Sequence, residues 1–127
     1  MPATYTIDKQ RELVLSSASG VLTFAGITER TDRLRSDPDF VPEYRELFDF
    51  TGATRIELSC TEIQDLAKWS PFAPSSRRAF LVAGDLAFGL GRVSTTYHDL
   101  NGEKNVIVFR DKDAALRWLE TGEQTEQ

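Results

Sequence analysis

The residues with the strongest claim to chemistry lie together in DFTGATRIELSCTEIQDL, residues 49–66. Ser59 and Cys60 stand where a strand-like run ends and a helical pattern begins. A hydroxyl at that position is a candidate phosphoacceptor, because the free N–H groups and the dipole of a helix N-terminus favour negative charge. Ser59 and Glu62 also fit the S-x-x-E capping box, in which each side chain accepts a hydrogen bond from a backbone N–H. The cap is the simpler interpretation of Ser59.

Few other side chains in the sequence have types suited to catalysis. Cys60 is the one cysteine, which excludes an intrachain disulfide, and we interpret it as a small hydrophobic residue. His98 is the one histidine, so no multi-histidine metal site or Ser-His-Asp triad can be argued, and we interpret it as a cation near a helix C-terminus. No G-x-G-x-x-G or P-loop pattern occurs. The sequence predicts a protein that is not an enzyme, with no catalytic residue, no cofactor and no metal.

A second candidate site lies in the loop-like segment AKWSPFAPSSRR, residues 67–78. Its aromatic and basic side chains are Trp69, Phe72, Arg77 and Arg78. Aromatic residues with arginine on an irregular loop are typical of contact surfaces, which predicts a homodimer or a protein partner here. The alternative is that Trp69 and Phe72 fold down and cover an edge of the sheet.

Composition narrows the classes of function. A chain of 127 residues fits a single domain, 1–127, of which we expect about 122–127 to be a frayed tail. The net charge of −5, with scattered basic residues, argues against a nucleic-acid partner. No run approaches the roughly 20 apolar residues of a membrane span. The beginning, MPATYTIDKQRE, lacks the apolar core of a signal peptide, so we expect a cytoplasmic protein.

The periodicity of apolar residues predicts alternating strands and helices that must position these side chains. A hairpin turning at Lys9 to Arg11 and ending at Gly20 opens the chain. The remaining expected elements are a helix from its cap at Thr23 to about Ser36, a strand over 44–50, a helix over 60–69, a strand over 78–84, a helix capped by Asp85, a strand within 101–110, and a helix from its cap at Asp111 to near Gly122. The order β-β-α-β-α-β-α-β-α predicts an α/β fold with one mixed, mostly parallel five-stranded sheet and four helices.

Four segments that together span nearly the whole chain carry a resemblance to a known family: GVLTFAGITER, DPDFVPEYRELFDF, SPFAPSSRRAFLVA and VFRDKDAALRWL. The chain resembles the STAS-domain fold of the bacterial anti-sigma-factor antagonists, the SpoIIAA-like proteins. In particular it resembles a group of short, uncharacterised bacterial proteins placed with them and with the Sec14-like folds. The resemblance implies one SpoIIAA-like domain.

The resemblance also gives Ser59 its claim to regulation. In the phosphoregulated antagonists, a strand ends in aspartate and an Asp-Ser-Ser-Gly-Leu motif then opens the second helix, with its second serine phosphorylated by a partner kinase. Asp49 matches the aspartate at the strand end. The motif falls, in order, on Glu57, Leu58, Ser59, Cys60 and Thr61, and of these Ser59 alone is identical.

Three functions follow as expectations. The first is a non-enzymatic binding or regulatory module of the STAS-like kind, acting through a protein partner, a homodimer or a small apolar ligand. The second is an anti-sigma-factor antagonist controlled by phosphorylation of Ser59. The third, by similarity to Sec14-like folds, is a domain that binds a small hydrophobic ligand or a lipid.

Overall fold

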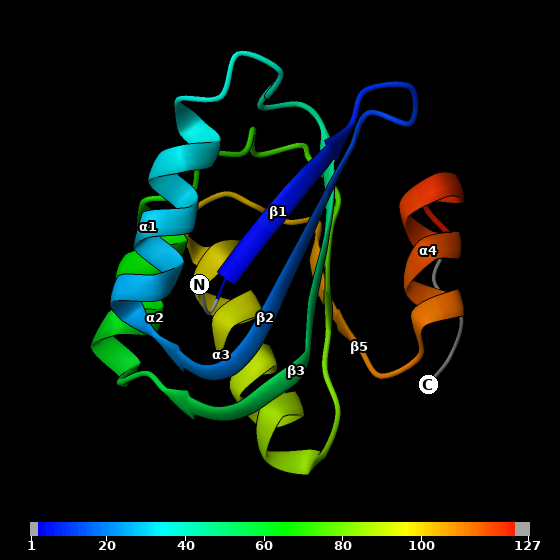
Figure 1. Cartoon of the computed structure of the whole chain (residues 1–127). Helices are drawn as coiled ribbons and strands as arrows, with labels where there is room; N and C mark the ends of the chain where they lie inside the picture. The colour runs from blue at the N-terminus through cyan, green and yellow to red at the C-terminus, as the bar shows by residue number, and fades with distance from the viewer. Residues whose placement is uncertain (1–2, 124–127) are drawn as a thin grey trace.

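A computed structural model describes residues 3–123 as one five-stranded sheet with helices on both faces (Figure 1). The elements are β1 (Ala3–Asp8), β2 (Leu13–Thr23), α1 (Phe24–Arg35), β3 (Arg45–Glu57), α2 (Cys60–Lys68), β4 (Arg78–Leu81), α3 (Asp85–Leu100), β5 (Val106–Phe109) and α4 (Lys112–Thr121). Their order confirms the predicted fold class. The expected frayed tail lies outside the described residues from position 124 on.

The strands lie in the order β1-β2-β3-β4-β5. β1 pairs antiparallel with β2, and every other neighbouring pair is parallel. Each parallel pair is joined by one helix, as a βαβ crossover requires. Helices α1, α2 and α3 cover one face of the sheet and α4 covers the other, as Figure 1 shows. The first three helices therefore form one layer over a shared face.

Strands β2 and β3 run further than the sequence predicts. β2 does not end at Gly20, which takes a left-handed φ of +65° inside the strand. Asp49 is likewise not the end of β3: it is the last residue paired with β4, while β3 continues to Glu57 beside β2. Two register shifts bend this β2–β3 ribbon. Figure 1 shows it curving toward the starts of α1 and α2.

The helix caps agree with the sequence at three of the four helices. Thr23, Ser59 and Asp111 are the N-caps of α1, α2 and α4, and α4 ends at Gly122 with a left-handed φ of +76°. The prediction that Asp85 caps α3 is wrong, because the N-cap is Gly84. Asp85 is the first residue of the helix, and its carboxylate pairs with Nη1 of Arg110 at 2.9 Å.

Each face of the sheet carries its own apolar core. On the α4 face, Phe109 packs against Trp118 with ring centroids 5.7 Å apart. On the opposite face, Phe48 and Phe80 belong to a cluster that reaches α1 through Ile27. None of the helices within residues 3–123 has the length and apolar character that a membrane crossing requires. The face under α1, α2 and α3 is where the candidate site lies.

Candidate functional site

A cavity of about 370 Å³ lies between α1, α2, α3 and the sheet face that they cover. Its size falls within the roughly 300–1,000 Å³ of small-molecule pockets. The curved β2–β3 ribbon contributes Leu22, Phe50 and Ile56 to its lining. The strand extension that the sequence did not predict therefore supplies part of the wall.

Aromatic rings form the sheet side of this cavity. Phe50 stacks on Phe48 with ring centroids 4.1 Å apart and meets Phe80 edge to face at 5.6 Å. All three rings line the cavity, together with aliphatic side chains from the helices, including Ile63, Leu66 and Leu90. These walls are suited to an apolar group, because burying apolar surface yields roughly 25 cal/mol per Å².

The same face of the sheet carries a fully buried carboxylate, Glu46 on β3. Nη1 of Arg30 donates to Oε2 of Glu46 at 2.9 Å, and Nη2 of Arg78 donates to Oε1 at 2.9 Å. The hydroxyl of Ser16 donates to Oε2 at 2.8 Å. Burial alone would raise the pKa of Glu46, but Arg78 and Arg30 hold it below its ordinary value. Glu46 is therefore an ionised group shared by two guanidinium groups.

The charged cluster continues from Arg78 to Glu103 and His98. Nη1 of Arg78 donates to Oε1 of Glu103 at 3.2 Å, and Nδ1 of His98 lies 3.0 Å from Oε2 of the same carboxylate. Burial would raise the pKa of Glu103, but the bonds from His98 and Arg78 lower it. Burial also lowers the pKa of His98, against the opposing effect of Glu103. His98 is thus neutral near pH 7, with its proton on Nδ1 because an ionised carboxylate can only accept.

This cluster corrects the interpretation of His98 and was missed in the sequence. His98 is not a cation at the helix C-terminus: its side chain is buried beneath α3, with Phe80 at 5.8 Å between ring centroids. The sequences of the strands did indicate that these charges are buried, because alternate residues of a strand share one face of the sheet. Glu46 shares its face with Phe48, and Arg78 shares its face with Phe80, so both charges had to be buried with those rings.

Ser59 lies on the surface, at the start of α2. Its hydroxyl accepts from the backbone N–H of Glu62 at 3.1 Å, and the Glu62 carboxylate accepts from the N–H of Ser59 at 2.9 Å. The predicted capping box is confirmed. Phosphorylation of Ser59 stays a prediction. Cys60 is exposed, so its interpretation as a small packed hydrophobic residue is wrong.

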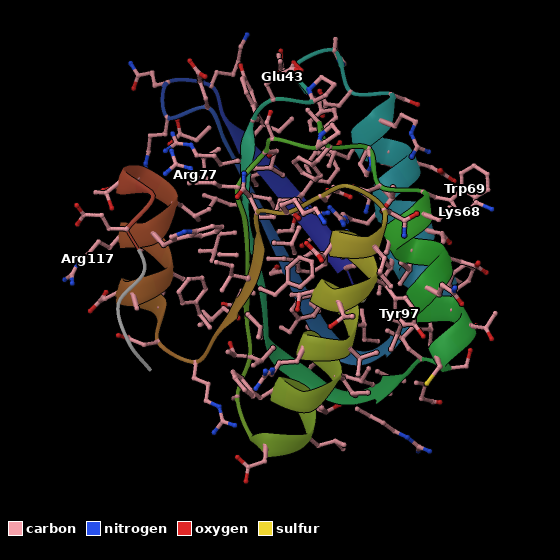
Figure 2. All side chains as sticks on the ribbon, turned by 180° about the vertical axis from the view of Figure 1, so that it is seen from behind. Glu43, Lys68, Trp69, Arg77, Tyr97 and Arg117 are labelled. Atoms are coloured by element: carbon pink, nitrogen blue, oxygen red, sulfur yellow. The ribbon has the colours of Figure 1, made fainter. Side chains whose placement is uncertain are left out.

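The four residues of the predicted contact surface do not share a surface. Phe72 and Arg78 are buried, and they pack together with the guanidinium 4.4 Å from the ring centroid. Trp69 is 63% exposed, whereas Arg77 reaches the far side of the sheet, where Nη1 donates to the carbonyl of Trp118 in α4 at 3.2 Å. Figure 2 shows Trp69 beside α2 and Arg77 on the α4 side.

Trp69 is nevertheless connected to the candidate site. It is exposed and also lines the cavity, which places it at the rim. Its carbonyl accepts from Nη2 of Arg35 at 2.6 Å, which ties the end of α2 to α1 across the opening. No group of three or more histidine, cysteine, aspartate or glutamate side chains within residues 3–123 is arranged to hold a metal ion.

Comparisons with known proteins bear on the fold. No family model matches the chain, and no curated protein matches it either. Among solved structures, it is similar to an uncharacterised protein of the DUF3478 family with a SpoIIAA-like fold, from Shewanella loihica PV-4. The TM-score is 0.59 and the identity 21%, over 92% of this chain and 93% of that one. The predicted SpoIIAA-like fold is confirmed.

Proposed function

We propose that this protein is a non-enzymatic binding module whose cavity under α1, α2 and α3 takes a small, mainly apolar ligand. The observation that carries the proposal is the cavity of about 370 Å³, walled by Phe48, Phe50 and Phe80. A pocket with mostly apolar walls and a few convergent polar groups is the usual form of a small-molecule site. Trp69 at the rim adds a large aromatic surface at the entrance.

Binding is favoured over catalysis by the partners of His98. A general base must contact the group that it deprotonates, and a nucleophile such as serine or cysteine must lie within hydrogen-bond reach of it. Within residues 3–123, the hydrogen bond that His98 makes through its side chain is to Glu103, and none joins it to a hydroxyl or thiol. The cavity therefore combines the shape of a binding pocket with a histidine that is held in place.

The test is displacement of a neutral, apolar naphthylamine fluorophore by straight-chain ligands. Ser94 on α3 lines the cavity, so Ser94→Leu places an apolar side chain inside it. We expect this variant to weaken fluorophore binding at least about tenfold, because the ligand and the leucine compete for one volume.

Thr96→Leu is the matched control, since Thr96 is exposed on the same helix and does not line the cavity. It adds a leucine to α3 without filling the pocket, and binding should stay near that of the unmodified protein. Circular dichroism confirms that both variants fold. Equal binding by both variants, or no saturable binding by the unmodified protein, would contradict the proposed function.

A further inference from the structure

One edge of the Arg30 guanidinium has no acceptor. Nη1 donates to Glu46 at 2.9 Å and to Ser16 at 3.3 Å. Nε is buried and has no hydrogen-bond partner, alone among the buried side-chain nitrogen and oxygen atoms of residues 3–123. Nη2 takes part in none of the hydrogen bonds or ion pairs found within those residues. The Nε–Nη2 edge is therefore left without a protein partner.

Arg78 in the same cluster differs from Arg30, because all three of its guanidinium nitrogens have acceptors. Its Nε and Nη2 both donate to Oε1 of Glu46, at 3.0 and 2.9 Å, and its Nη1 donates to Ser70 and Glu103. Leaving a buried N–H without an acceptor is costly, and more so for a charged group. An arginine that is 2% exposed and only half paired therefore points to an acceptor from outside the chain.

Arg30 lines the cavity from α1, so a ligand in the cavity lies against this residue. The Nε and Nη2 hydrogens of a guanidinium are parallel and match the two oxygens of a carboxylate in a bidentate pair. The remaining walls are mostly apolar. We propose that the ligand of this cavity is an apolar monocarboxylic acid, with its carboxylate on the Nε–Nη2 edge of Arg30 and its hydrocarbon part against the phenylalanine rings.

The charges of the cluster add a consequence. Within the buried cluster, Arg30 and Arg78 balance Glu46 and Glu103 when His98 is neutral, so a carboxylate bound at Arg30 leaves the cluster with one negative charge in excess. Elsewhere in the lining, Arg35 pairs with Asp32, and Asp65 adds a further carboxylate. His98 lines the same cavity, and its charged neighbours are Glu103 after α3, Arg78 on β4 and Glu46 on β3. Protonation of His98 restores the balance. Binding of the acid therefore raises the pKa of His98, takes up a proton, and becomes tighter as the pH falls through that raised pKa.

The inference rests on the proposed function, and its test separates the two. Decanoic acid, decanol and decylamine share one hydrocarbon chain and differ in the head group. We expect the acid to displace the neutral fluorophore at least about tenfold more effectively than the alcohol, because hydrogen bonds between charged groups are stronger than those to a neutral hydroxyl. Equal binding of all three ligands overturns the proposed preference for a carboxylate and is consistent with the proposed function. Displacement by none of them contradicts both.

Arg30→Gln should abolish the preference for decanoic acid over decanol, so that the two ligands displace the fluorophore about equally. Arg92→Gln is the control, because it removes the same charge from an exposed position that does not line the cavity. Arg30 also holds Glu46, so the variant could fail to fold, and a second measurement covers that case. In the unmodified protein, the ¹⁵N–¹H signal of the Arg30 Nε should shift on adding decanoic acid and not on adding decanol. An unmoved Arg30 signal with saturating acid overturns the assignment.

Discussion

Replacing Glu46 with glutamine tests the charged cluster most directly. Glu46 is fully buried and accepts from Arg30, Arg78 and Ser16. The glutamine side chain keeps nearly the same shape but removes the charge, and its amide nitrogen meets a guanidinium as a second donor. Arg30 then has no carboxylate partner and Arg78 keeps only Glu103. Breaking a buried ion pair in this way costs about 3–5 kcal/mol.

That loss is large against the stability of a single domain, which is about 5–15 kcal/mol. In urea, with a dependence on denaturant of roughly 2 kcal/mol per M, the midpoint should fall by about 1.5–2.5 M. The assay is equilibrium unfolding followed by tryptophan fluorescence and circular dichroism, since Trp118 is buried and Trp69 is exposed.

Glu29→Gln is the matched control. Glu29 also pairs with an arginine, Arg33, at 3.2 Å, but on the exposed side of α1. Such a pair contributes about 0.3–0.5 kcal/mol, so its removal should scarcely move the midpoint. If Glu46→Gln destabilises the protein no more than Glu29→Gln does, the buried cluster does not hold the sheet to α1, and the reasoning is refuted.

The pH dependence of stability in acid gives a second test of the Glu46→Gln variant. The pKa of Glu46 in the folded protein lies below its ordinary value of 4.5, so folding favours the ionised form. Its contribution to stability is complete above that ordinary value and is lost as the pH falls through the lower folded pKa. Glu46→Gln should therefore lose part of the acid dependence of stability below pH 4.5. If stability falls with pH below 4.5 in the variant as it does in the unmodified protein, the ion pairing of Glu46 is contradicted.

Three further outcomes are expected. The pKa of His98 should lie below 6.5 by NMR titration, because burial favours the neutral ring. The stability that depends on a neutral His98 is present above pH 6.5 and is lost as the pH falls through the folded pKa. A titration midpoint of His98 above 6.5 would contradict this prediction. Gly89→Ala should stabilise α3 by up to ~1 kcal/mol, because nothing lies near the added methyl group. Gly91→Ala should destabilise the protein by about 1–3 kcal/mol, because the Cβ of the new alanine would lie 2.7 Å from Cγ2 of Val108. Similar urea midpoints for the two variants would refute the close packing at Gly91. Ser59→Ala should lower the free energy of unfolding by about 1 kcal/mol through loss of the cap, and an unchanged midpoint would argue against it.

Local patterns predicted the elements, and the reason lies in local energetics. The caps Thr23, Ser59 and Asp111 act within one helical turn, so their sequence neighbourhood is sufficient to place them. The end of β3 was misplaced because residues 51–57, TGATRIE, lack the apolar alternation of a strand. They are held as a strand by their ladder with β2, which is a non-local interaction.

The candidate site is non-local throughout, which is why the sequence did not reveal it. Arg30, Glu46, Arg78, His98 and Glu103 come from α1, β3, β4, α3 and the segment after α3. Arginine and glutamate are mostly exposed in proteins and histidine is intermediate, so none of these positions by itself indicates burial. The predicted contact surface of Trp69, Phe72, Arg77 and Arg78 does not form, because the consecutive residues Arg77 and Arg78 reach opposite faces of the sheet, toward α4 and toward Glu46.

Stability alone does not account for the buried cluster. A buried ion pair or triad is often no more stabilising than apolar side chains of similar volume, because desolvation offsets the attraction between the charges. The interaction of Arg30 with Glu46 and Ser16 does, however, fix the guanidinium through Nη1. A guanidinium fixed on one side presents the other side in one orientation, so less side-chain entropy is lost when a ligand binds. Under the proposed function, the cluster is thus better explained as the support that orients Arg30 for a ligand than as a source of stability.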